Sequence, residues 1–86
     1  MKNKKTKKEV IIYSTPTCHY CEVAKEFFED NKIPFKALNV AADLEARKEM
    51  VSKSGQLGVP VITIGDLIIV GFSPDKEDLI KKELGL

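Results

Sequence analysis

The sequence predicts an α/β domain built on a mixed four-stranded sheet with helices on its faces. Short runs of β-branched residues alternate with longer stretches of helical periodicity, and the order of these elements is β-α-β-α-β-β-α. The 86 residues are enough for one domain. Apolar residues at 43% and charged residues at 31% are typical of globular proteins, so disorder is not expected.

The first third of the chain has the pattern of a β-α-β unit. Residues Val10–Ser14 form a nearly continuous apolar run, as in a strand buried on both faces, and residues 15–17 interrupt it. Residues 18–31 have the apolar stripe of an amphipathic helix, and a second strand is expected at residues 35–39. A crossover of this kind is right-handed and makes its two strands parallel.

A second helix is predicted after the second strand. Asp43 is suited to cap its start, and Gly55 is placed where a left-handed residue ends a helix. Three apolar side chains of this helix are expected to point into the core: Leu44, Met50 and Val51.

The last part of the chain reads as a hairpin followed by a helix. Two strand runs, Val61–Ile64 and Leu67–Val70, are joined by residues 65–66, Gly-Asp, which favour a type II′ turn. Ser73 before Pro74 is a start signal for the final helix, which is expected to run to Leu84. Periodicity does not fix the order of the strands in the sheet.

Cys18 and Cys21 are the two cysteines of the chain and lie where the first strand gives way to the first helix. Unpaired N–H groups and the positive end of the helix dipole stabilise a thiolate there. Cys18, at the helix start, is therefore expected to ionise below the pKa of about 8.5 of a free thiol. Cys21 is one turn further on the same side, within reach of a mixed disulfide on Cys18. The pair predicts thiol–disulfide exchange.

Two other interpretations of the cysteine pair remain open. A structural zinc ion normally takes four ligands, whereas the Cys and His residues of the chain are Cys18, His19 and Cys21. An intramolecular zinc site would need carboxylates in addition, and no metal site is expected. The cysteines could also be ordinary buried residues without chemistry, but their place within a β-α-β pattern favours the redox interpretation.

Three motifs resemble those of the glutaredoxins and occur in the same order. Residues 10–21 resemble the first strand and the active site, whose usual motif is Cys-Pro-Tyr-Cys. Residues 58–60, Gly-Val-Pro, and the glycine turn in residues 71–75 resemble two further family signatures. The likeness covers residues 10–84. It implies a thioredoxin-like three-layer sandwich over residues 10–86, with Cys18 as nucleophile and Cys21 as resolving thiol.

The resemblance also implies a substrate-binding surface. In the family, the backbone at the position of Val59 pairs with a bound peptide or glutathione, and the following proline, here Pro60, is cis. Without the resemblance, Pro60 reads as a proline that starts a strand. The remaining residues of this expected surface are His19, Tyr20, Gly71, Phe72 and Asp75.

The roles of the aromatic residues are left as alternatives. Phe72 is expected to be a semi-exposed contact beside the active site, and otherwise a packing residue before the last helix. Tyr13 and Tyr20 either face a substrate or pack near a strand end, whereas Phe27 and Phe28 are expected in the core.

Several positions depart from the family pattern. His19 replaces the usual proline; as a cation it would favour the Cys18 thiolate and raise the reduction potential, whereas a neutral His19 would do little. Thr15 stands where glutathione-dependent members have a basic residue, and residues 71–75 lack the usual Gly-Gly and paired acids. The latter segment is similar to that of redoxins that reduce ribonucleotide reductase and draw electrons from thioredoxin reductase.

These features predict a dithiol–disulfide oxidoreductase that reduces protein disulfides or mixed disulfides, with ribonucleotide reductase as a candidate partner. No tightly bound cofactor is expected, and electrons would come from glutathione or a thioredoxin-reductase-type flavoprotein. A monomer is expected. The alternative is an iron–sulfur-cluster or metal-binding thiol module that acts as a dimer without redox turnover.

Residues 1–9 are expected to form a flexible basic tail, with five lysines and one acid. The tail either improves solubility or steers the protein to an acidic partner. No aromatic residue separates its lysines, so nucleic-acid binding is not expected. No apolar run approaches the roughly 18 residues of a membrane helix, and no signal-peptide pattern follows the lysines. The expected location is therefore the cytoplasm, without a membrane partner.

Overall fold

The computed structural model describes residues 9–85, so the predicted basic tail, apart from Glu9, lies outside the described residues. The elements follow in the order β1 (Val10–Ser14), α1 (His19–Asp30), β2 (Lys36–Asn39), α2 (Leu44–Ser54), β3 (Val61–Ile64), β4 (Leu67–Val70) and α3 (Pro74–Leu84). This is the predicted order. The first helix starts one residue later than expected because Cys18 is its N-cap, and β2 also starts one residue later.

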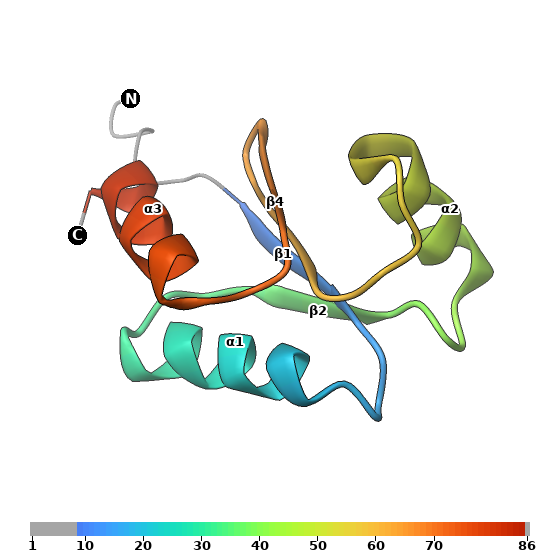
Figure 1. The fold of residues 1–86 in the computed structure, drawn as a ribbon, viewed down its shortest axis with the longest axis horizontal. Coiled ribbons are helices and arrows are strands. Elements are labelled where there is room, and N and C mark those ends of the chain that lie inside the picture. The colour runs from blue at the N-terminus through green and yellow to red at the C-terminus, as the bar shows by residue number, and fades with distance from the viewer. Residues whose placement is uncertain (1–8, 86) are drawn as a thin grey trace.

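The strand order in the sheet is β2-β1-β3-β4. β1 is parallel to β2 and antiparallel to β3, and β3 pairs with β4 as an antiparallel hairpin. Gly65 has a φ of 58° at the first position of the hairpin turn, as a type II′ turn requires. The mixed four-stranded sheet predicted from the sequence is confirmed. The carboxyl ends of β1, β2 and β4 therefore share one edge with the start of β3 (Figure 1).

The sheet is the middle of three layers. Alternate residues of β1 point to opposite faces, as the pleat requires. Val10 and Ile12 belong to a core cluster that α1 and α3 cover; the fully buried residues of these helices in the cluster are Ala24, Phe28 and Ile80. Tyr13 packs on the other face in a smaller cluster under α2, whose buried residues also include Val40, Ala46, Met50 and Val61.

The inward orientation predicted for Leu44 is wrong, because 61% of this residue is exposed. The buried residues Ala46 and Met50 define the inner face of α2. Leu44 precedes Ala46 by two positions, which is about 200° around a helix of 3.6 residues per turn. Met50 is buried and Val51 is half-buried, as predicted. Asp43 caps α2 by accepting the Ala46 N–H, and Gly55 ends it with a φ of 77°.

The end of α1 is held by two backbone hydrogen bonds that characterise a Schellman motif. The N–H of Ile33 donates to the carbonyl of Phe28 and the N–H of Lys32 donates to that of Glu29. Lys32 has a φ of 58°, in the left-handed region that favours glycine. That conformation costs a residue with a Cβ roughly 1–2 kcal/mol.

Lys32→Gly is therefore expected to stabilise the protein. Part of the relief of strain is offset by the greater freedom of glycine in the unfolded chain, so the net gain is about 0.5–1 kcal/mol. Urea unfolding of the two proteins measures it. Lys32→Ala keeps the Cβ and is the control, which should bring no such gain; equal stabilisation by both would contradict the explanation.

Tyr13 has a buried hydroxyl, and no hydrogen bond of standard geometry reaches it from the described residues. Burial, followed by the nearby carboxylate of Glu49 on α2, raises the pKa of Tyr13 to about 12 from 10.0. The unfolded chain therefore loses this proton at lower pH than the folded protein does. The stability that the protonated Tyr13 contributes to the folded protein is therefore complete below pH 10 and is lost as the pH rises towards 12.

Tyr13→Phe is expected to stabilise the protein by about 1 kcal/mol at neutral pH, because it removes an unpaired buried hydroxyl. Its advantage over the natural protein should widen as the pH rises above 10, since phenylalanine has no proton to lose. Unfolding by urea at neutral pH and at two pH values above 10 tests both parts. Tyr20→Phe is the control, because it removes the hydroxyl of an exposed tyrosine and should bring no such gain. A variant less stable than the natural protein would show that the hydroxyl has a partner.

Candidate active site

Cys18 is the N-cap of α1, at the end of the segment that leaves β1. Its backbone is extended, with φ −89° and ψ 112°, and its Sγ accepts a hydrogen bond of 3.1 Å from the backbone N–H of Cys21. The sulfur thus occupies the place that a serine or aspartate oxygen usually takes at a helix start. The position of the pair at the strand-to-helix junction is confirmed.

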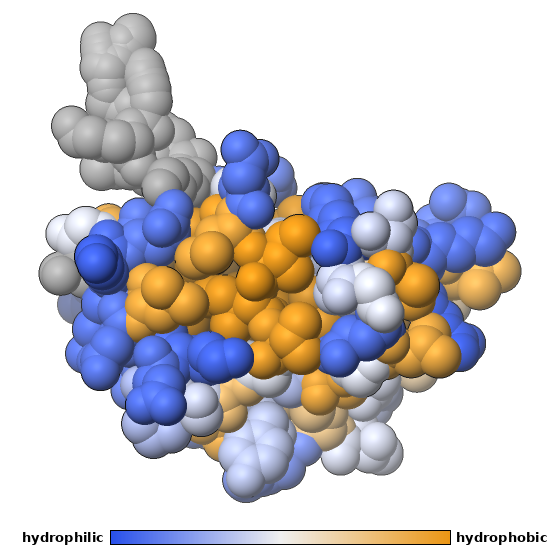
Figure 2. Space-filling view, turned by 45° about the horizontal axis from the view of Figure 1, so that its top comes forward, coloured by the Kyte–Doolittle hydropathy of each residue, from blue (hydrophilic) through white to orange (hydrophobic). Residues whose placement is uncertain are grey.

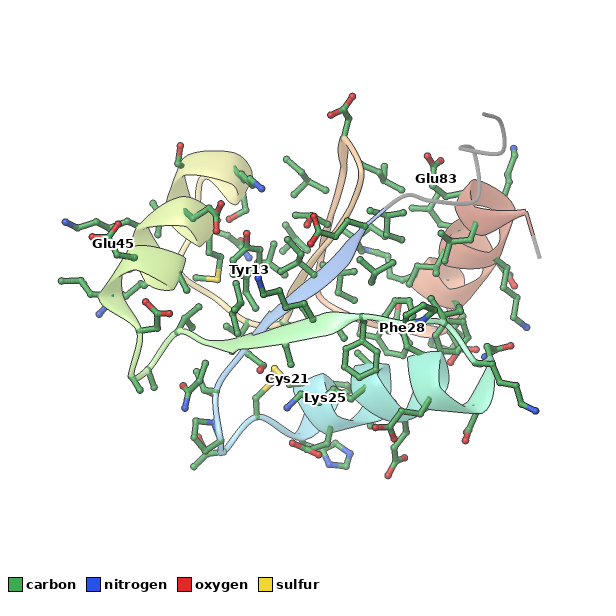
Figure 3. All side chains as sticks on the ribbon, turned by 180° about the vertical axis from the view of Figure 1, so that it is seen from behind. Tyr13, Cys21, Lys25, Phe28, Glu45 and Glu83 are labelled. Carbon is green, nitrogen blue, oxygen red and sulfur yellow. A yellow bond between two sulfur atoms is a disulfide. The ribbon has the colours of Figure 1, made fainter. Side chains whose placement is uncertain are left out.

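Cys18 and Cys21 form a disulfide, with 5.2 Å between their Cα atoms. They differ in accessibility. Cys18 is half-buried, whereas Cys21 is completely buried at the first turn of α1, on the side that faces the sheet (Figure 3). An incoming disulfide can therefore reach the first sulfur but not the second. The geometry suits a pair in which one thiol meets the substrate and the other acts after it.

Val59 and Pro60 are joined by a cis peptide bond, as the resemblance implied. Val59 is half-buried and Pro60 is buried, directly before β3. The Pro60 carbonyl accepts a hydrogen bond of 2.8 Å from the N–H of Gly71, which extends the β3–β4 pairing by one step. Because β1 and β3 are antiparallel, Pro60 lies at the same edge of the sheet as the segment that carries Cys18.

His19 and Tyr20 are exposed next to Cys18, with their rings 5.5 Å apart in an edge-to-face arrangement. Tyr20 is 60% exposed and does not pack in the core, whereas Tyr13 does. Asp75 is exposed in the first turn of α3. Of these three predicted residues, His19 and Tyr20 lie next to the cysteine pair, whereas Asp75 lies on α3, after the Gly71 turn.

The expectation that Phe72 is semi-exposed is wrong. Its side chain is buried in the cluster under α1 and α3, with its ring 5.6 Å from that of Phe27. Phe72 directly precedes the start of α3, so its burial anchors that helix against α1. This is the packing alternative that the sequence left open.

Three further residues at this edge were not singled out from the sequence. Leu57 and Val70 are apolar but exposed, and Lys76 donates a hydrogen bond of 2.9 Å from its Nζ to the Val70 carbonyl. Apolar character alone predicts a core position for Leu57 and Val70, whereas the structure shows Leu57 exposed in the loop before β3 and Val70 exposed on β4. Within residues 9–85, no group of three His, Cys, Asp or Glu residues could hold a metal ion. None of the helices described is long and apolar enough to cross a membrane.

Comparison with known proteins places this site in a family. The family model described as Glutaredoxin matches residues 10–69. An "uncharacterized glutaredoxin-like 8.6 kDa protein in rubredoxin operon" of Clostridium pasteurianum is 51% identical over 72 residues, which cover 83% of this chain and 96% of that protein. Glutaredoxin 3 of Escherichia coli K12 is 36% identical over 55 residues, 64% of this chain and 66% of that protein.

Solved structures agree with the fold. The glutaredoxin-like protein NrdH-redoxin from Escherichia coli is similar with a TM-score of 0.71 and 30% identity, covering 84% of this chain and 93% of that chain. Methanoredoxin from Methanosarcina acetivorans has a TM-score of 0.80 at 24% identity, over 92% of this chain and 86% of that chain. The predicted thioredoxin-like sandwich is confirmed by these likenesses and by the observed topology.

Proposed function

Because the chain belongs to the glutaredoxin family, we propose that it is a dithiol–disulfide oxidoreductase that reduces protein disulfides or mixed disulfides. One observation carries the proposal. The Sγ of Cys18 is accessible at the start of α1 and accepts the Cys21 N–H, while Cys21 itself is buried behind it. An accessible sulfur with a donor aimed at it is an arrangement that favours its thiolate.

In the first step, the Cys18 thiolate attacks one sulfur of the substrate disulfide. A mixed disulfide forms with Cys18, and the other substrate sulfur leaves as a thiolate that takes up a proton from water. The hydrogen bond from the Cys21 N–H, at 3.1 Å, supports the negative charge of the attacking sulfur before the reaction. Thiolate formation at Cys18 thus needs no basic side chain.

In the second step, Cys21 displaces the substrate from Cys18. Cys21 gives up its proton, its sulfur bonds to that of Cys18, and the second substrate sulfur leaves as a thiol after protonation. The protein dithiol loses two electrons and the substrate disulfide gains them. The Cα atoms are 5.2 Å apart, so the ring closes within the first turn of α1.

An external reductant must then reopen the disulfide. We propose that it is glutathione or a thioredoxin-reductase-type flavoprotein. A buckwheat glutaredoxin has been solved as a glutathione complex, and it is 19% identical to this chain. The structure of NrdH-redoxin is described as the basis of a thioredoxin-like activity profile. Reduction coupled to NADPH oxidation, with each donor in turn, decides between them.

The basic activity is tested without any donor. The protein is first reduced and then mixed with bis(2-hydroxyethyl) disulfide, a small substrate without flanking residues. Each protein molecule is expected to release two thiols and to return to the Cys18–Cys21 disulfide, which mass spectrometry after alkylation detects. If the reduced protein leaves this substrate and protein disulfides intact, the proposed function is wrong.

A further inference from the structure

The edge of the sheet that carries Cys18 is made of uncharged segments. The carboxyl ends of β1, β2 and β4 meet there with the start of β3. The stretches of sequence at these strand ends and in the adjoining loops, residues 14–21, 39–42, 54–61 and 70–74, contain no Asp, Glu, Lys or Arg. This is unusual in a chain in which 31% of residues are charged. The charged residues are thus concentrated elsewhere on the molecule.

Five charged residues border these stretches: Glu22, Asp43, Lys53, Asp75 and Lys76. Four of them are engaged within the chain. Lys53 pairs with Glu49 at 3.8 Å. Glu22 pairs with Lys25 at 3.5 Å, and Asp43 accepts the Ala46 N–H at 3.1 Å. The Nζ of Lys76 donates to the Val70 carbonyl at 2.9 Å. Asp75 is the exposed exception, and it lies on α3 beyond the Gly71 turn.

Apolar side chains are exposed in the same region. Leu57 is 60% exposed and precedes Val59 by two residues, while Val70 is 38% exposed and precedes Gly71. The hydrogen bond from Gly71 to Pro60 ties these two segments together. Figure 2 shows hydrophobic side chains in a continuous patch along β4 between α3 and α2, and the carboxyl end of β4 lies at the edge that carries Cys18. Exposed apolar surface next to a reactive group favours a partner that covers it.

We propose that this edge selects polypeptides in which the disulfide cysteine is flanked by uncharged, apolar residues, with Leu57 and Val70 as specificity-determining residues. The inference rests on the proposed function and names its substrate class. An extended segment can pair its backbone with that of Val59 and place apolar side chains against Leu57 and Val70. A substrate with carboxylates beside its sulfur would lose part of their hydration at this edge, where the two bordering lysines among the described residues, Lys53 and Lys76, already have partners.

Glutathione is such an acidic substrate, since its two carboxylates lie close to its cysteine. It shares the sulfur chemistry of a peptide disulfide but not the apolar flanks. The proposal therefore expects glutathione mixed disulfides to react more slowly than apolar peptide disulfides.

The test uses single turnovers of the reduced protein, so the choice of electron donor does not matter. Two synthetic peptides each carry one cysteine in a mixed disulfide with 2-nitro-5-thiobenzoate; one has Val and Leu flanks and the other has Glu flanks. The Cys18 thiolate attacks the peptide sulfur and releases the coloured thiolate, which is followed by absorbance. Covering one exposed leucine-sized side chain is worth about 1.4 kcal/mol, so the apolar peptide is expected to react about tenfold faster. This ratio should hold at high salt.

Leu57→Glu and Val70→Glu identify the surface. Each is expected to slow the reaction with the apolar peptide by about fivefold to tenfold, because binding this peptide would then bury an unpaired carboxylate. Both variants should slow the reaction with bis(2-hydroxyethyl) disulfide, which has no flanking residues, far less than the reaction with the apolar peptide. Leu79→Glu is the matched control, because Leu79 on α3 is 40% exposed, close to the 38% of Val70. Because Leu57 lies in a loop, Leu57→Glu still tests the surface if Val70→Glu disturbs β4.

The outcomes separate this inference from the proposed function. Equal rates for the two peptides, faster reaction of a glutathione mixed disulfide, or an equal effect of Leu79→Glu would overturn the selectivity while the disulfide chemistry stands. No reaction with bis(2-hydroxyethyl) disulfide would overturn the proposed function and this inference with it.

Discussion

Cys18→Ser is expected to lower the rate of disulfide reduction by a factor of about 10³ or more, to the background level. A serine hydroxyl does not ionise at neutral pH, so no nucleophile remains at the accessible position. Cys21 cannot substitute for it, because its side chain is completely buried. The measurement is the initial rate with bis(2-hydroxyethyl) disulfide under conditions in which the natural protein turns over.

The same variant should fold normally, which makes the loss chemical rather than structural. Serine is a preferred N-cap residue, and its oxygen can accept the Cys21 N–H that the sulfur accepts now. The midpoint of thermal unfolding should therefore equal or exceed that of the reduced natural protein. Substantial activity in a folded Cys18→Ser protein would mean that the roles of the two cysteines are assigned wrongly.

Cys21→Ser is expected to stop the reaction after its first step. Cys18 still attacks the substrate, but no second thiol displaces what it holds, so a mixed disulfide accumulates. We expect release of one thiol equivalent per protein and then a fall in turnover of about 10² or more. The adduct adds the mass of half the substrate to Cys18, as mass spectrometry after proteolysis would show.

Trapping by this variant also identifies partners, with Cys18→Ser as its control. Only a protein with an intact Cys18 should hold a substrate, because the first attack requires the accessible sulfur. If Cys18→Ser captured the same partners as Cys21→Ser, Cys21 would be reachable in solution and the assigned order of steps would be reversed.

Local signals were sufficient for most of the secondary structure. β3 and β4 have the predicted limits because two β-branched runs flank a two-residue turn that begins with glycine. Asp43 and Gly55 delimit α2 because each satisfies backbone groups that a helix end leaves unpaired. The position of β1 beside both β2 and β3 was not predictable from such signals, since strand order depends on contacts between distant segments.

The orientation of single apolar side chains was predicted less well. The burial of Leu44 and of Phe72 was predicted wrongly: Leu44 is exposed and Phe72 is buried. For Leu44, hydrophobicity favours burial but does not say whether α2 turns the residue inwards. For Phe72, the expected contact beside the active site was wrong and the burial that its hydrophobicity favours was found. As with Leu44, hydrophobicity suggested burial for Leu57 and Val70, so these exposed residues were not recognised as part of the site.

The core of the site was predictable because it is local. Cys18 and Cys21 are one helical turn apart, and the strand-to-helix junction fixes their orientation. Pro60 is different, because its place at the same edge depends on the antiparallel pairing of β1 and β3. Only the resemblance to the glutaredoxins connected it with the cysteines in advance.

The ionisation of Cys18 is the most direct test of this account. In reduced Cys21→Ser protein, Cys18 is the remaining cysteine, and its rate of alkylation by iodoacetamide against pH reports its thiolate. The N-cap position and the Cys21 backbone donor predict half-ionisation well below pH 8.5, by about one unit or more. Half-ionisation at or above the value of about 8.5 for a free thiol would contradict the central role given to this sulfur.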